Sequence, residues 1–138
     1  MKEKLFPTEW TATQYRVVFP SHLNPAGTLF GGEAIRWLDE TAFIAATRCT
    51  RQRMVTVKIH EVRFLRPVLP DTILEIKACI VRAGHVKLEI AVEAWAEDLY
   101  SERREKVIEA GFVFAPCNGD FTPALLQVTA PATLPAAE

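Results

Sequence analysis

One stretch of this 138-residue chain has the pattern of a long helix, and the other patterned stretches read as strands. The helix is predicted over residues 33–48 and follows a turn-rich loop that ends in the glycine pair Gly31-Gly32. At about 100° per residue, one arc of this helix is apolar, and it is formed by Ala34, Ile35, Leu38, Ala42, Ala45 and Ala46. A single helix can cover only one face of a sheet, so this feature limits the fold more strongly than any other.

Strands are predicted wherever apolar and polar residues alternate. The alternating stretches are residues 11–19, 54–65, 72–82, 86–97 and 106–114. Long consecutive strands joined by short turns, each with one polar side, indicate an antiparallel sheet with one covered face. We therefore predict an α+β fold in which one long central helix is wrapped by a curved antiparallel sheet of five to six strands.

Two local features of these strands carry predictions of their own. In the stretch over residues 54–65, the alternating Val55, Val57 and Ile59 are expected to face the core. The alternation then slips by one residue at His60-Glu61, which predicts a β-bulge. Between the next two strands, Gly84 is expected to adopt a positive φ in a tight hairpin turn.

Composition describes an ordinary soluble domain. Residues 1–115 fit one domain, and the Pro-, Ala- and Thr-rich residues 116–138 are expected to form an extended or disordered tail. A net charge of −1 gives no electrostatic footprint for nucleic acid. The apolar runs are too short for a membrane span or a signal peptide, so we expect a cytoplasmic protein with no membrane partner. Neither the three cysteines nor the three histidines have metal-ligand spacing, so we expect reduced thiols and no metal site.

Asp39 is the unusual residue of the predicted helix. It lies at the edge of the apolar arc, where a carboxylate is costly unless it is hydrogen-bonded or used in chemistry. Two readings are open: a boundary aspartate bonded to a neighbouring backbone group, or a catalytic carboxylate. The glycine-rich loop before the helix leaves unpaired N–H groups at the positive end of the helix dipole. Such an end can bind an anion or a polarised carbonyl oxygen.

The order of strand, glycine-rich loop, single helix and curved antiparallel sheet resembles the hotdog-fold acyl-CoA thioesterases. Residues 24–32, Asn-Pro-Ala-Gly-Thr-Leu-Phe-Gly-Gly, resemble the N-x-x-G-x-x-x-G-G loop of that family's acyl-CoA hydrolase branch, which includes broad-range bacterial and brain-type enzymes. Leu38-Asp39-Glu40 is similar to the helix motif of this branch, and Val55-Thr56-Val57 to its next strand. The resemblance covers roughly residues 12–115.

This resemblance implies hydrolysis of acyl-CoA to a free carboxylic acid and CoA, without a cofactor. Asp39 corresponds to the carboxylate that acts as general base on water or as nucleophile. Asn24 corresponds to the loop asparagine that lies close to the aspartate of the partner subunit. The backbone N–H groups of Gly31 and Gly32 correspond to the donors that polarise the thioester carbonyl.

The resemblance also implies a homodimer with two sites across the subunit interface, and in this family such dimers are often assembled further into a trimer of dimers. Trp37 and Ile44 are large apolar residues on the polar side of the predicted helix. A neighbouring subunit would explain them, because two stacked apolar residues at this spacing indicate a second packed surface.

CoA would need positive charge for its phosphates and a groove for its pantetheine arm. The candidates are residues near the exit of the second strand and near the following hairpin: Arg63, Arg66, Pro67, Arg82, Gly84, His85 and Lys87. In the hairpin, the family's basic residue and glycine are matched by Arg82 and Gly84, but no small hydroxyl residue follows. For each basic residue taken alone, an ordinary solvated surface charge is the more common role.

Two other functions are open for a chain of this pattern. An acyl-thioester hydratase or dehydratase would use a catalytic histidine, and neither His22 nor His60 lies in a comparable motif. A non-catalytic acyl-CoA-binding module would bind acyl-CoA without releasing a thiol. Ser21-His22 is no nucleophile–base pair, because adjacent loop residues rarely bring their side chains into that geometry.

Overall fold

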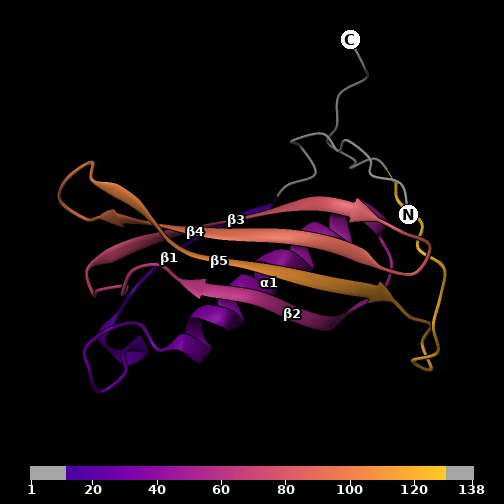
Figure 1. Ribbon diagram of the computed structural model, residues 1–138, viewed down its shortest axis with the longest axis horizontal. Helices are drawn as coiled ribbons and strands as arrows, with labels where there is room; N and C mark the ends of the chain where they lie inside the picture. The colour runs from indigo at the N-terminus through magenta and orange to yellow at the C-terminus, as the bar shows by residue number, and fades with distance from the viewer. Residues whose placement is uncertain (1–11, 130–138) are drawn as a thin grey trace, which may run out of the picture.

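The computed structural model describes residues 12–129 of the chain. Five strands, one short 3-10 turn and one long helix follow one another along this part of the chain (Figure 1). Their bounds are β1 Ala12–Val17, η2 Pro20–His22, α1 Gly31–Thr50, β2 Met54–Phe64, β3 Thr72–Ala83, β4 Leu88–Asp98 and β5 Arg104–Pro116. The helix begins two residues before the predicted start and ends two residues after the predicted end.

The strands form one antiparallel sheet in the order β1-β3-β4-β5-β2. The long central strands β3, β4 and β5 are neighbours along the chain, and β1 and β2 are the two edges. Helix α1 runs along one face of this curved sheet (Figure 1). One helix against a five-stranded curved sheet is the hotdog fold, so the predicted α+β architecture is confirmed.

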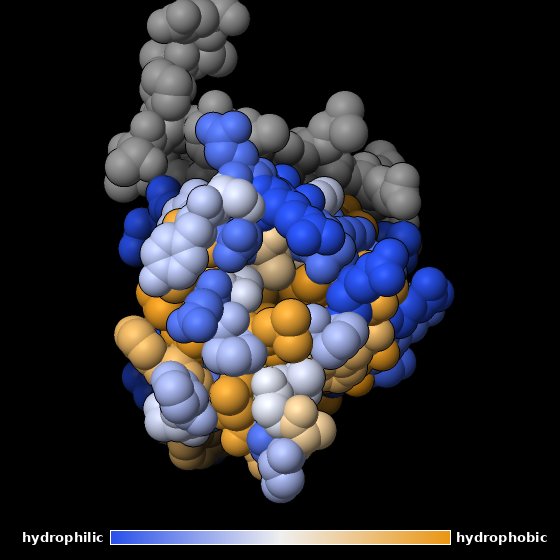
Figure 2. Space-filling model, turned by 90° about the vertical axis from the view of Figure 1, so that its left-hand side faces the viewer, coloured by the Kyte–Doolittle hydropathy of each residue, from blue (hydrophilic) through white to orange (hydrophobic). Residues whose placement is uncertain are grey.

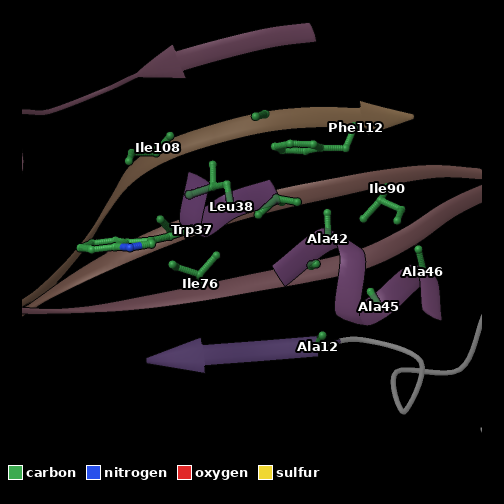
Figure 3. Close-up of a cluster of buried hydrophobic side chains, with 14 of the residues drawn as sticks. Ala12, Trp37, Leu38, Ala42, Ala45, Ala46, Ile76, Ile90, Ile108 and Phe112 are labelled. Atoms are coloured by element: carbon green, nitrogen blue, oxygen red, sulfur yellow. The ribbon is translucent and has the colours of Figure 1, made fainter. Parts of the chain in front are cut away.

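The core lies between α1 and the helix-facing side of the sheet (Figure 3). Small alanines of the helix let its backbone approach the sheet closely, and the larger side chains of the strands fill the space around them. Fully buried members from the helix include Leu38, Ala42 and Ala46, and from the strands Ile76, Ile90, Ile108 and Phe112. The predicted alternation of β3, β4 and β5 is therefore confirmed.

Strand β2 departs from prediction, because Val55, Val57 and Ile59 are 39%, 51% and 39% exposed instead of facing the core. A register shift between Thr56 and Lys58 leaves Val57 unmatched in the pairing with β5. This shift interrupts the alternation of inward and outward side chains. Because β2 is an edge strand, it has a neighbouring strand on one side only, which leaves its side chains more exposed. The bulge predicted at His60-Glu61 is confirmed, since the register shifts there again and Glu61 has a φ of 52°.

The β3–β4 hairpin is present but has a different turn. Gly84 has no positive φ, and the one described glycine with a positive φ is Gly27, at 83°. The N–H of Gly84 donates to the oxygen of Lys87 at 2.8 Å, which closes a longer turn that needs no left-handed glycine. Val86, predicted in the strand, lies in this turn and is exposed.

Trp37 needs no neighbouring subunit to bury it, contrary to prediction. Its side chain is 1% exposed within the single chain. The ring of His22 packs edge-on against it with centroids 4.9 Å apart, and the guanidinium of Arg16 lies 5.3 Å from its centroid. Strand β1 and the following loop therefore cover this side of α1, which a helical wheel shows as polar. Ile44, further along, is only half-buried.

After β5 the chain returns across the C-terminal end of α1. The N–H of Leu126 donates to the oxygen of His85 at 2.7 Å, and that of Thr129 to the oxygen of Cys49 at 2.7 Å. The side-chain amide of Gln52 bonds the same segment at 2.8 and 2.9 Å. Residues 117–129 thus join the helix end to the β3–β4 hairpin. Among the described residues, no helix is long and apolar enough to cross a membrane.

Candidate active site

Asp39 lies two turns into α1, on the side of the helix nearest β2. Its Oδ1 accepts a hydrogen bond from Oγ1 of Thr56 at 2.8 Å. Thr56 pairs with the buried Phe114 of β5, which places its side chain on the helix-facing side of the sheet. One of the two readings of the sequence was an Asp39 carboxylate bonded to a neighbouring backbone group. In the structure Asp39 is instead bonded to the side chain of a residue 17 positions further along.

The half-buried Asp39 lines a hollow of about 460 Å³ between the two edge strands. One part of its wall is apolar and consists of Phe43, Ile44 and Met54. The other lining residues are polar: Gln14, Arg16, Glu40 and Thr56. A concave site with an apolar wall and a few convergent polar groups is the usual form of a small-molecule site.

Glu40, the second carboxylate of this hollow, is held in ion pairs. Nη2 of Arg16 lies 2.8 Å from its Oε1, and Nε of Arg36 lies 3.5 Å from its Oε2. The bond from Arg16 ties strand β1 to the helix next to Asp39. The two adjacent carboxylates therefore have different environments, one paired with cations and one bonded to a hydroxyl.

Asn24 shapes its own loop. Its Oδ1 accepts the N–H groups of Ala26 and Thr28 at 2.9 and 3.1 Å, and its Nδ2 donates to Oγ1 of Thr28 at 3.0 Å. Gly27, within this turn, has the positive φ that a glycine adopts without strain. An asparagine amide carries two N–H bonds, so one remains beyond the bond to Thr28.

The first turn of α1 presents its backbone donors outward. Phe30 at the N-cap makes no side-chain capping bond, and the N–H of Ala34 donates to the oxygen of Phe30 at 3.0 Å. The N–H groups of Gly31 and Gly32 precede this first helical bond and lie at the positive end of the helix dipole. Gly31 lines a second hollow, of about 240 Å³, whose other residues are Asn24, Thr28, Leu29, Phe64, Arg66, Pro67 and Val68.

Figure 2 views this end of the molecule, where α1 begins and β2 ends. Apolar surface is exposed here between charged groups (Figure 2). Three exposed phenylalanines belong to the segments at this end: Phe19 before η2, Phe30 before α1 and Phe64 at the end of β2. Apolar surface around unpaired donors is suited to a ligand or to another protein chain.

The sequence-predicted residues fall into separate places within one chain. Asn24 and Gly31 share the smaller hollow with Arg66 and Pro67, whereas Asp39 lines the larger one. Arg63 lies on the outer face of the sheet, 3.9 Å from Glu109. The remaining four CoA candidates belong to the β3–β4 hairpin, at the opposite end of α1 from the glycine-rich loop (Figure 1); they are Arg82, Gly84, His85 and Lys87.

His22 and His60, the two histidines considered for catalysis, line neither of these two hollows. Nδ1 of His22 accepts the N–H of Phe19 at 3.1 Å while its ring packs on Trp37. His60 lies over Gly111 on the outer face of the sheet, where a Cβ on that glycine would approach its Cε1 to 2.5 Å. Both are structural contacts. Within residues 12–129, no three His, Cys, Asp or Glu side chains gather as a metal site would require.

Among the lining residues of the larger hollow that were not predicted as site residues are Thr56 and Phe43. No sequence signal marked Thr56, because the alternation placed Val55 and Val57 on the core side and Thr56 on the opposite side. Phe43 follows Asp39 by one helical turn, so the helical wheel places the two side chains close together, but no role was assigned to Phe43 from the sequence.

Residues 26–102 match the thioesterase superfamily. The chain therefore belongs to the thioesterase superfamily. The acyl-CoA thioester hydrolase YciA of Salmonella typhimurium is 30% identical over 115 residues, which cover 81% of this chain and 86% of that protein. Acyl-coenzyme A thioesterase 11 of Mus musculus is 32% identical over 104 residues, which cover 75% of this chain but only 17% of the mouse protein.

Solved structures show the same fold. An acyl-CoA hydrolase from Staphylococcus aureus, in complex with butyryl-CoA, CoA and CoA disulfide, has a TM-score of 0.81 and 26% identity, and the match covers 88% of this chain and 74% of that one. A hexameric thioesterase from Yersinia pestis has a TM-score of 0.79 and 25% identity, with 84% and 94% covered. Three further structures of the Staphylococcus enzyme each carry one alanine substitution. The replaced residues are an asparagine, an aspartate 15 residues later, and a threonine 17 residues after the aspartate.

Proposed function

We propose that this protein is an acyl-CoA thioesterase, which hydrolyses acyl-CoA to a free carboxylic acid and CoA. The observation that carries the proposal is the Asp39 carboxylate, held by Thr56 in a hollow with an apolar wall. A thioester is already an activated acyl group, so one carboxylate, one water and a set of N–H donors suffice. Membership of the thioesterase superfamily and the similarity to YciA support it. The reaction needs no cofactor, since CoA belongs to the substrate.

Residue spacing supports roles for Asn24, Asp39 and Thr56. They are separated by 15 and 17 positions, the same intervals as the three residues altered in the Staphylococcus enzyme. In our proposal Asn24 orients water or substrate, Asp39 drives the attack, and Thr56 positions Asp39. The N–H groups of Gly31 and Gly32 hold the thioester oxygen as negative charge develops on it.

The attack on the thioester can follow two routes. As general base, Asp39 takes a proton from water, the water oxygen bonds to the carbonyl carbon, the C–S bond breaks and the thiolate of CoA takes up the proton. As nucleophile, Asp39 bonds to that carbon itself, CoA leaves, and water then opens the resulting anhydride. A single turnover in ¹⁸O-labelled water distinguishes them, because only the second route exchanges an oxygen of the Asp39 side chain.

We further propose that the working unit is a homo-oligomer, with Asp39 of one chain facing the Asn24 loop of another. Support comes from the separation of the two hollows within one chain and from the exposed apolar residues of the edge strand β2. Unpaired strand edges with apolar side chains are typical interfaces. The hexameric Yersinia relative agrees with a dimer or a trimer of dimers.

For CoA, Arg66 and Pro67 are our first candidates, because both line the hollow that holds Asn24 and Gly31. The hairpin residues Arg82, Gly84, His85 and Lys87 lie at the other end of α1 and could approach this hollow only from a second chain. Arg63 lies on the outer face and directly precedes Phe64, which lines this hollow. We also propose a cytoplasmic location, because the described cysteines Cys49, Cys79 and Cys117 form no disulfide with one another.

The proposal is tested by replacing Asp39 and measuring thiol release from acyl-CoA. Asp39→Asn should fold and assemble normally, yet lose at least a hundredfold in kcat, because a positioned base or nucleophile supplies about that much. Glu40→Gln is the matched control, since it removes the adjacent carboxylate of the same hollow and should keep most of the turnover. Full activity in Asp39→Asn would remove Asp39 from the mechanism.

A further inference from the structure

We propose that Phe43 ends the acyl channel and so limits the substrates to acyl chains of about six carbons or fewer. This inference rests on the proposed function, because it assumes that the thioester carbon lies beside Asp39. It assigns a specificity-determining role to a residue that the family motif does not include.

Phe43 lies one helical turn beyond Asp39 on α1. It follows Asp39 by four residues, which places both side chains on one side of the helix. Both residues line the same hollow. The ring of Phe43 leans on the buried ring of Phe114, with centroids 6.4 Å apart and planes tilted by 50°. One side of the ring is thus anchored to the sheet, while 45% of the residue stays exposed.

The apolar wall gives the direction in which an acyl chain would extend. Phe43 and Ile44 both lie on the C-terminal side of Asp39 in α1. Met54 also lies on this side, because β2 begins near the end of the helix and Met54 precedes Thr56. The charged residues Arg16 and Glu40 are unsuited to hydrocarbon. A chain whose carbonyl lies beside Asp39 would therefore run toward Phe43.

The distance from Asp39 to Phe43 sets the length limit. Four residues advance about 6 Å along a helix. An extended chain advances about 1.2 Å per bond, so about five bonds span that distance. Of the three apolar wall residues, Met54 is buried and Ile44 is half-buried, so Phe43 is the one whose truncation opens space without cutting deeply into the core.

The experiment compares the wild type with Phe43→Ala over straight acyl-CoAs of two to sixteen carbons, scored as kcat/KM for thiol release. The wild type should peak at four to six carbons and fall steeply beyond. Phe43→Ala should move the peak outward, with a gain of about fourfold for each additional methylene that becomes buried. Phe43→Leu opens less space and should move the peak less, and it replaces Phe43→Ala if that variant does not fold. Phe121→Ala is the control, because it removes an exposed phenylalanine outside the hollow.

A second series separates this inference from the proposed function. S-alkyl-CoA thioethers of the same lengths cannot be hydrolysed, and their affinities report chain placement alone. If they bind while no acyl-CoA releases thiol, the proposed function fails, and an outward shift in the Phe43→Ala affinity profile still supports the inference. The inference would be overturned if Phe43→Ala changed kcat/KM, or the thioether affinity, by the same factor at every chain length. Thioethers that do not bind at all would also overturn it.

Discussion

Thr56 positions Asp39 through one hydrogen bond between a strand and a helix. Both residues lie on regular elements that the core holds in place, so the scaffold sets the direction of the carboxylate. The loop and helix motif singled out Asp39, whereas Thr56 looked like one polar residue in a Val-rich strand. A strand pattern says which side a residue faces. A bond across to a helix depends on how the helix lies on the sheet, and no local pattern encodes that.

Replacing Thr56 should therefore affect rate more than stability. Thr56→Val keeps the shape and removes the hydroxyl, so kcat/KM for acyl-CoA should fall about tenfold, which is the usual effect of a lost hydrogen bond to a charged group. The free energy of unfolding should change little, because Thr56 is exposed in the chain. Thr56→Ser keeps the hydroxyl and should stay near wild-type rates. An unchanged rate in Thr56→Val would show that Asp39 needs no such support.

Glu75 is a buried carboxylate away from the candidate site, and it predicts how stability depends on pH. The guanidinium of Arg104 donates to it and holds the pKa of Glu75 below its usual 4.5, and the hydroxyl of Tyr15 donates at 2.8 Å. This hydrogen bond to Glu75 raises the pKa of Tyr15 above its usual 10.0. Because the folded state binds the Glu75 proton less readily, the pair stabilises the fold above pH 4.5 and loses that effect as pH falls through the lower folded pKa.

Glu75→Gln should accordingly destabilise the protein by about 1.5 kcal/mol at neutral pH. The difference from the wild type should shrink when unfolding is measured in urea at successively lower pH below about 4.5. An equal difference at neutral and acidic pH would mean that the charge of Glu75 contributes nothing.

Strand β2 shows why an alternating pattern identifies a strand better than it identifies what covers the strand. The strands β3, β4 and β5 each face α1 within the same chain, and their buried sides were predicted correctly. Strand β2 is an edge with two register shifts, so its apolar residues are divided and exposed. The prediction for Trp37 was wrong in the opposite sense. This residue was expected to need a neighbouring subunit, but β1 and the following loop cover the helix side that the wheel shows as polar. In both cases the missing information is which segments meet in three dimensions.

The contact between β5 and β2 at Gly111 can be tested directly. A Cβ at this position would lie 2.5 Å from Cε1 of His60, so Gly111→Ala should destabilise the fold by about 1 kcal/mol. In a His60→Ala background the same change should become neutral or stabilise by about 0.5 kcal/mol, because alanine restricts the unfolded chain more than glycine does. Urea unfolding of the four proteins measures this coupling. If Gly111→Ala lowers the free energy of unfolding equally in both backgrounds, the imidazole of His60 is not the reason that glycine is favoured at position 111.

Considered as a whole molecule, the single chain holds the residues of the proposed site in two places. The glycine-rich loop, with Asn24 and the first donors of α1, lines one hollow, and Asp39 lines the other. The loop motif could be read from sequence because it is a short local pattern. The separation of the hollows could not, because it follows from the length of α1 and from the side of the helix that each residue occupies. Two chains placed with Asp39 of one against the loop of the other would assemble the complete site.

Complementation between two inactive variants tests this shared site most directly. Asn24→Asp keeps the oxygen that shapes the loop but removes the free amide, and Asp39→Asn removes the carboxylate. Each variant carries a different affinity tag, both are expressed together, and the mixed oligomer is purified through both tags. We predict that each variant alone releases almost no thiol from acyl-CoA, whereas a mixed dimer has about half the wild-type activity, since one of its two sites is intact. Mixed dimers as inactive as the parent variants would place the whole site within one chain and contradict the account.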